Sequence, residues 1–212
     1  MGNRYINFGC GTHCPPEFIN YDGSFNLYLQ RMPLIGSLVK SAVSVKFPSN
    51  ALYGDIIKGL PVAEGSADGL YSSHVLEHLS LEDLRKALRN CHRYLKPGGL
   101  FRSVLPNLED CLRTYREERA AGDPMAAHHF MQYTFLGYEK RPSGFVDLLK
   151  WHFSGYHHFW MWDYEAMEKE LYDAGFSKVS RSGFNQSADP YFKHVEVAGR
   201  FDFNALCFEA VK

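Results

Sequence analysis

Short apolar runs alternate with helix-patterned segments along the first half of this chain. Apolar and β-branched residues form five short runs, at residues 5–8, 18–22, 51–56, 67–73 and 100–106. Runs of this length and composition, bounded by glycine, proline or acidic residues, are typical of β-strands. The alternation of such strands with helical segments predicts an α/β fold, Rossmann-like, with a mostly parallel sheet and helices on both of its faces. Their carboxyl ends should share one edge of the sheet.

The clearest helix is predicted just after the fourth run. Leu81, Leu84, Leu88, Cys91 and Leu95 recur at steps of three and four, which indicates one buried helical face. Ser80 stands at the N-cap position with Asp83 three residues later, as in a capping box. We expect residues 74–79 to form a short helical turn before this helix, and residues 96–99 (Lys-Pro-Gly-Gly) to end it with a turn.

Residues 107–162 depart from this alternation. Helices are predicted at 108–121, 126–135 and 145–153, and the segment is dense in aromatic residues and holds five histidines. We interpret it as a helical insert or lid over the carboxyl edge of the sheet, within a single domain spanning residues 1–212. The alternative is that most of its aromatic side chains only form the insert's own core.

Two further segments have weaker patterns. Residues 24–40 are loosely helical and interrupted at Pro33. Asp163 is a plausible cap for a helix that ends at Gly175. Strands are then predicted at 176–180 and 202–211, and the long connection between them allows this pair to be antiparallel.

Composition narrows the classes of function. The chain has 212 residues, a net charge of −1 and no apolar run long enough to span a membrane. It therefore has no general electrostatic attraction for nucleic acid or an anionic surface. Five scattered cysteines and the lack of a signal-peptide pattern favour free thiols in the cytoplasm. Cys10, His13 and Cys14 lack a second pair at zinc-finger spacing, so no metal site is predicted.

Candidate ligand-binding chemistry begins where the first strand ends. Gly9 and Gly11 flank Cys10 in a Gly-x-Gly turn, where missing Cβ atoms allow positive φ angles and close approach of a ligand. Asp22, at the end of the second strand, offers a carboxylate that accepts hydrogen bonds from a ribose diol. Ordinary tight turns explain Gly-x-Gly and Asp-Gly equally well when each is taken alone. Only nine residues separate the two predicted strands, and Pro15 and Pro16 among them predict a loop or a helical turn instead of a full crossover helix.

Several motifs in register resemble the class I S-adenosylmethionine-dependent methyltransferases, in particular a small bacterial branch with a shortened first crossover. The matching segments are 7–12 (Asn-Phe-Gly-Cys-Gly-Thr), 18–22, Gly54-Asp55, 73–78 (Ser-His-Val-Leu-Glu-His), 95–99 and 174–176. The pair formed by 75–78 and 95–99 is the specific part of this resemblance.

The resemblance implies a cofactor and roles for individual residues. Gly9 and Gly11 would hold the amino-acid part of S-adenosylmethionine, Asp22 its ribose and Asp55 its adenine, with Ser73 and His74 beneath the sulfonium. The implied cofactor-binding set is Phe8, Gly9, Cys10, Gly11, Thr12, Asp22, Gly23, Gly54, Asp55, Ile56, Ser73 and His74.

Methyl transfer also needs an acceptor site and, for an oxygen nucleophile, a general base. His74, Glu77, His157 and His158 are the candidate catalytic residues, because imidazole titrates near neutrality. We expect O-methylation of a small-molecule or glycan-type acceptor, with the insert around it. For each of these histidines an ordinary packing or surface role is the alternative.

Two other classes of function remain open from the sequence. The chain departs from the family pattern at Asn7, where an acid is usual, and at His13, where a third glycine is usual. A catalytically degenerate binding module is therefore one alternative. A nicotinamide-dependent oxidoreductase is a weaker one, because Cys14 stands where its fingerprint needs glycine or alanine and Asp22 is too near.

Overall fold

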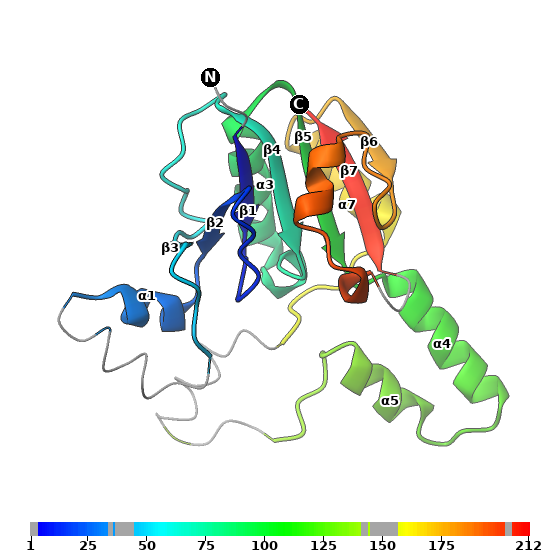
Figure 1. Cartoon of the computed structure of the whole chain (residues 1–212). Coiled ribbons are helices and arrows are strands. Elements are labelled where there is room, and N and C mark those ends of the chain that lie inside the picture. The colour runs from blue at the N-terminus through cyan, green and yellow to red at the C-terminus, as the bar shows by residue number, and fades with distance from the viewer. Residues whose placement is uncertain (1–3, 34–35, 37–44, 141–143, 145–156, 202–204) are drawn as a thin grey trace.

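The computed structural model describes residues 4–33, 45–140, 157–201 and 205–212, together with residues 36 and 144. Its centre is a seven-stranded sheet in the order β3-β2-β1-β4-β5-β7-β6 (Figure 1). The strands are β1 Tyr5–Phe8, β2 Ile19–Asp22, β3 Ala51–Tyr53, β4 Ala67–Ser73, β5 Leu95–Leu105, β6 Lys178–Arg181 and β7 Leu206–Val211.

The first five strands pair in parallel, as the sequence predicts, and their carboxyl ends share one edge. β7 then pairs antiparallel with both β5 and β6. The crossover from β1 to β2 contains no helix, although the two strands are parallel with Ile6 opposite Ile19. The predicted loop at this crossover is therefore confirmed.

Two helices cover one face of the sheet. These are α3, Leu81–Tyr94, and α7, Tyr164–Asp173. Ser80 caps α3 by accepting a hydrogen bond from the Asp83 backbone N–H, and Asp163 caps α7 through Ala166. The apolar side chains of both helices pack on a core shared with β1, β4, β5 and β7, which includes Ile6, Phe8, Leu70, Phe101, Leu84, Leu88, Met167 and Leu171.

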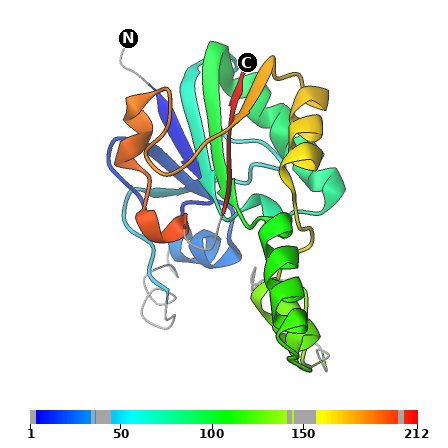
Figure 2. The ribbon, with the colours of Figure 1, turned by 90° about the vertical axis from the view of Figure 1, so that its right-hand side faces the viewer.

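The other face is covered by the chain between β6 and β7. Two short 3₁₀ helices form there, η2 Pro190–His194 and η3 Ala198–Arg200 (Figure 2, orange, opposite α3 and α7). Phe192 and Val195 pack on Tyr5 and Tyr71 of the sheet. Helices thus lie on both faces, but on this side they come from the late part of the chain.

A buried ion cluster fixes this covering segment to the sheet. The Arg102 side chain of β5 is fully buried and forms ion pairs with Glu196 of the covering segment and, at 2.9 Å, with Glu209 of β7. It also donates hydrogen bonds to the Ser182 hydroxyl and the Gly183 carbonyl. Opposite charges and a full set of acceptors are what a buried guanidinium requires.

Some predicted boundaries were wrong. Residues 96–99 do not form a separate turn after α3; they belong to β5, where Gly98 has a φ of 76° and the register with β4 shifts. The glycines make a bulge within the strand because the extra residues have no partners on β4. β6 begins two residues later than predicted, at Lys178.

Other predictions have a partial outcome. The 24–40 segment begins with α1, Phe25–Arg31, while 34–35 and 37–44 lie outside the described residues. The helix predicted at 145–153 and residues 202–204 of the last predicted strand also lie outside them.

The described helices of the predicted insert lie beyond the carboxyl edge of the sheet. They are α4, Leu108–Ala120, and α5, Ala126–Tyr133, and in both views they extend away from the ends of the parallel strands (Figures 1 and 2). The chain returns to the sheet at Trp162, whose carbonyl accepts a hydrogen bond from the Leu108 N–H at 2.8 Å. Among the described residues, no helix has the length and apolar character needed to cross a lipid bilayer.

Candidate active site

The turn after β1 has the backbone that the two glycines predict. Gly9 and Gly11 have φ angles of 65° and 53°, a region that residues with a Cβ atom rarely adopt. A Cβ on Gly9 would lie 2.3 Å from Cγ2 of Val75, whereas a Cβ on Gly11 would have no heavy atom within 4 Å. Gly9 therefore packs against the loop after β4, whereas the space at the Gly11 Cα is free for a ligand to approach.

Asp22 ties the end of β2 to this turn. One carboxylate oxygen accepts a hydrogen bond from the Gly11 N–H at 2.9 Å, and the other accepts from the Ser24 N–H at 2.8 Å. Gly23 lies against the backbone of Gly54 and Asp55 at the end of β3. Each oxygen of Asp22 keeps a further lone pair, so the carboxylate still has the capacity to accept from a ligand.

The remaining predicted cofactor residues differ in what they present. Phe8 and Ile56 point into the core, so only their backbones are available at the edge. The Cys10 thiol is buried, 3.4 Å from the Cys14 sulfur, while Thr12 is exposed. Asp55 uses its carboxylate locally, accepting from the Ile57 N–H and pairing with Lys58 at 3.4 Å.

A narrow hollow opens beside the glycine turn. It is lined by Asn7, Gly9, Cys10, His13, Tyr71, Ser73, Val195, Val197 and Arg200. The hydroxyls of Tyr71 and Ser73 are buried there, beside each other. Buried hydroxyls normally have partners. Free space at Gly11, a carboxylate with spare lone pairs and two buried hydroxyls fit a polar cofactor such as S-adenosylmethionine.

The loop after β4 places His74 beside Glu77. His74 has a φ of 54°, and its Nδ1 lies 3.1 Å from the Glu77 carboxylate. Its Nε2 lies 3.0 Å from the carbonyl oxygen of Arg200. A carboxylate and a carbonyl both accept hydrogen bonds, so the two ring nitrogens are placed to donate when His74 is protonated. Burial acts to lower the pKa of His74, but the hydrogen bond and charge of Glu77 outweigh it and raise that pKa.

Glu77 also lies close to His158, which comes from the chain returning from the insert. The two side chains are almost fully buried, with His158 Nε2 4.0 Å from Oε1 of Glu77. Burial lowers the pKa of His158. Glu77 lies in the 3₁₀ turn η1, Leu76–His78. The backbone carbonyl of Glu77 accepts hydrogen bonds from the backbone N–H groups of Phe159 and Trp160. Three of the four predicted catalytic residues, His74, Glu77 and His158, therefore cluster around one carboxylate.

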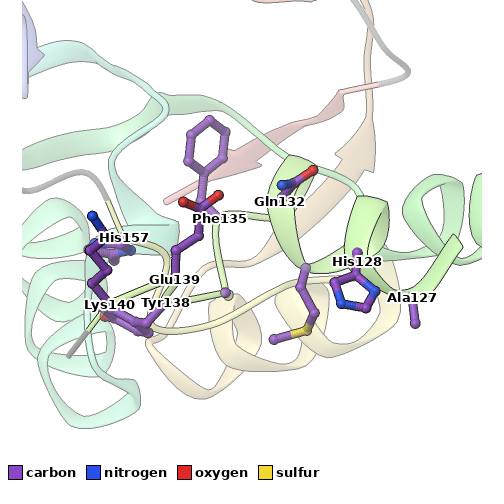
Figure 3. Close-up of a pocket in the computed structure, with 10 residues that line it drawn as sticks. Ala127, His128, Gln132, Phe135, Tyr138, Glu139, Lys140 and His157 are labelled. Atoms are coloured by element: carbon purple, nitrogen blue, oxygen red, sulfur yellow. The ribbon is translucent and has the colours of Figure 1, made fainter. Parts of the chain in front are cut away.

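His157, the fourth, faces a different space. Its ring stacks on Tyr138 with centroids 4.0 Å apart. It borders a cavity of about 740 Å³ formed by α5 and the chain after it (Figure 3). The residues around this cavity are Ala127, His128, Met131, Gln132, Phe135, Gly137, Tyr138, Glu139, Lys140 and His157. His157 and His158 are adjacent in the sequence, but the His158 ring lies beside Glu77 and the His157 ring borders the cavity.

The sequence alone did not identify some residues at this edge. Tyr71, Val195, Val197 and Arg200 line the hollow, and no motif marks them. His78 adjoins Glu77 in the predicted motif, but its contact with the His157 carbonyl, at 2.9 Å, joins segments far apart in the chain. A histidine directly after a candidate acid was the only available signal.

Comparisons with known proteins agree with this geometry. Residues 7–103 match a family model described as a methyltransferase domain. A search of curated proteins gives no match.

Solved structures show the same fold at low sequence identity. A Thermotoga maritima S-adenosylmethionine-dependent methyltransferase, described as a possible histamine N-methyltransferase, is 15% identical with a TM-score of 0.51; the match covers 100% of this chain and 83% of that one. An Archaeoglobus fulgidus S-adenosylmethionine-dependent methyltransferase is 16% identical with a TM-score of 0.51, covering 99% and 86%. Haemonchus contortus phosphoethanolamine N-methyltransferase 2, solved with S-adenosylhomocysteine, is 15% identical with a TM-score of 0.50, covering 100% and 49%.

The domain match begins in β1 and ends in β5, so it contains the glycine turn, Asp22 and the loop that carries Ser73, His74 and Glu77. The sheet around these residues is the Rossmann-like methyltransferase sheet. Residues 7–103 therefore form a methyltransferase domain, and the sheet that contains it has the fold of S-adenosylmethionine-dependent methyltransferases.

Proposed function

We propose that this methyltransferase transfers the methyl group to an oxygen atom of a small-molecule or glycan-type acceptor in the cytoplasm. The observation that carries the proposal is the cavity beside His157. Its volume of about 740 Å³ lies in the range of small-molecule sites. Phe135, Tyr138 and His157 offer ring faces, and Gln132 and Glu139 offer hydrogen-bonding groups, a combination suited to a ring that carries hydroxyls.

The proposed donor site is the carboxyl edge of β1, β2 and β4. S-adenosylmethionine supplies a methyl group on a sulfonium, which a nucleophile displaces in line. Gly9 and Gly11 would hold its amino-acid part, Asp22 its ribose hydroxyls and Asp55, or the backbone beside it, its adenine. The position of the Ser73 hydroxyl in the hollow beside the glycine turn supports a place for Ser73 beneath the sulfonium.

Contacts between side chains connect the proposed donor and acceptor sites. Ser73 adjoins His74, which pairs with Glu77, and Glu77 lies next to His158. The ring of His158 packs against Phe135, which lines the cavity. This continuity supports the role of residues 107–162 as a lid that excludes water and selects the acceptor.

Among the four candidate catalytic residues, His157 is the proposed general base. It is the only one of the four that lines the cavity. Both ring nitrogens of His74 already lie against other groups, Glu77 and the Arg200 carbonyl, so its proposed role is to hold Glu77 in place. Glu77 and His158 would then position the returning chain from which His157 projects.

The test is methyl transfer to a panel of sugars, phenols and amines, followed through S-adenosylhomocysteine formation. We expect hydroxyl acceptors to react and His157→Ala to lower turnover about 10²–10⁴-fold with unchanged S-adenosylhomocysteine affinity. His129→Ala, outside the cavity lining, is the matched control. Because two of the similar structures are named for N-methylation, amines belong in the panel; reaction of amines alone would reject oxygen as the acceptor atom. Tight cofactor binding without turnover of any class would instead support the binding-module alternative.

A further inference from the structure

A buried carboxylate and two imidazoles meet where the loop after β4 touches the chain returning from the insert. One ligand atom from each of Glu77, His78 and His158 lies within 4.8 Å of the other two. The side chains of Glu77 and His158 are only 1% and 7% exposed. The three residues come from segments 80 positions apart, so the fold alone brings them together.

The Glu77 carboxylate is incompletely paired. His74 donates to Oε1, but Oε2 is buried and has no hydrogen-bond partner among the described residues. Leaving such an oxygen unpaired is costly, and buried charges are normally paired or coordinate a metal. The unpaired oxygen is therefore an independent sign that this cluster receives a ligand.

A hydrogen bond to the His157 carbonyl orients one of the two imidazoles, His78, for coordination. His78 Nδ1 lies 2.9 Å from the His157 carbonyl, which can only accept, so Nδ1 carries the proton and Nε2 keeps its lone pair. Metal-bound histidines usually donate their other N–H to a carbonyl in this way, and ligating carboxylates are hydrogen-bonded, as Glu77 is by His74. The His78 and His158 rings pack edge to face with centroids 4.9 Å apart.

We propose that Glu77, His78 and His158 bind a divalent transition-metal ion of the zinc class. Two imidazoles and one carboxylate suit such an ion, whereas magnesium and calcium prefer oxygen ligands alone. Zinc ligands at about 2.0–2.2 Å require the three side chains to close by about 1 Å, and a set of three protein ligands leaves one position for water. Bound there, the ion fastens the chain returning from the insert, residues 157–162, to the loop after β4.

The experiment is a metal titration of the full-length, untagged chain after treatment with a chelator. Zinc binding is measured by calorimetry in competition with a chelator of known affinity, and cobalt binding by its visible absorption. We expect one ion per wild-type chain and a rise in Tm on binding. Glu77→Gln and His158→Gln should each weaken binding at least tenfold. Circular dichroism checks that each variant folds, and His78→Gln replaces any that does not.

A second cluster in the same chain provides the matched control. Glu118, Asp123 and His129 also lie within ligand distance of one another, and Glu118 Oε2 is likewise buried without a hydrogen bond to a described residue, but all three side chains are partly exposed. His129→Ala should leave the single ion in place. The proposal is overturned if the wild-type chain binds no stoichiometric ion, if the folded Glu77 and His158 variants bind as tightly as wild type, or if His129→Ala abolishes binding. None of these readouts depends on methyl transfer.

Discussion

The contact between Gly9 and Val75 gives a quantitative test of how the glycine turn is held. Gly9→Ala introduces two separate costs. A residue with a Cβ atom at a φ of 65° is strained by about 1–2 kcal/mol. The new methyl group would also lie 2.3 Å and 3.1 Å from the two γ-methyl groups of Val75, an overpacking that typically costs about 1–3 kcal/mol. We therefore expect Gly9→Ala to lower the free energy of unfolding by about 2–5 kcal/mol.

Val75→Ala separates these two costs. It removes both γ-methyl groups and leaves Cβ of Val75 3.3 Å from the new methyl, a tight but tolerable contact. In the Val75→Ala background, Gly9→Ala should therefore cost only the backbone strain of about 1–2 kcal/mol. The coupling between the two substitutions should be about 1–3 kcal/mol in the direction of rescue. Gly11→Ala, at a φ of 53° with no atom nearby, controls for strain without overpacking.

The measurement is urea unfolding of the four proteins of this cycle and of Gly11→Ala, followed by circular dichroism and compared at equal m-values. If Gly9→Ala lowers the free energy of unfolding equally in the wild-type and Val75→Ala backgrounds, the Val75 methyl groups do not restrict the residue at position 9. The reasoning from this contact would then be wrong. If Gly11→Ala costs as much as Gly9→Ala, overpacking is not the difference between the two glycines.

Three further predictions concern separate parts of the molecule. Arg102→Met leaves the carboxylates of Glu196 and Glu209 buried without their cation and should cost about 3–5 kcal/mol in urea unfolding; a loss below about 1 kcal/mol would contradict a buried ion cluster. Asp22→Ala and Gly11→Val should each weaken S-adenosylhomocysteine binding by about 1–3 kcal/mol in calorimetry, and unchanged affinity in both would remove this turn as the cofactor site. Burial acts to raise the pKa of Asp68, but hydrogen bonds from Lys96 and the Arg4 N–H outweigh it and lower that pKa. The stability advantage of wild type over Asp68→Asn should thus be present above the ordinary carboxyl pKa of about 3.8 and be lost as pH falls through the lowered value; an advantage that is independent of pH would contradict this.

The sequence determined the features that depend on neighbours in the chain. The apolar runs and the three- and four-residue spacing predicted the five parallel strands and α3, because backbone hydrogen bonding and side-chain periodicity are local properties. Ser80 and Asp163 identified helix starts for the same reason. The Gly-x-Gly turn could be predicted because only glycine adopts these φ angles without strain.

The tertiary structure decided what depends on segments far apart. Residues 190–200 cover the sheet face that the helix-free first crossover leaves open, and nothing in their local pattern specifies that position. Arg102 lies in a run that reads as an ordinary strand, and its burial depends on Glu196, 94 residues away. His157 and His158 are adjacent in sequence, yet one faces a cavity and the other faces Glu77. The positions of these side chains depend on packing between distant segments and on the partners that buried charges require. A local sequence pattern contains neither kind of information.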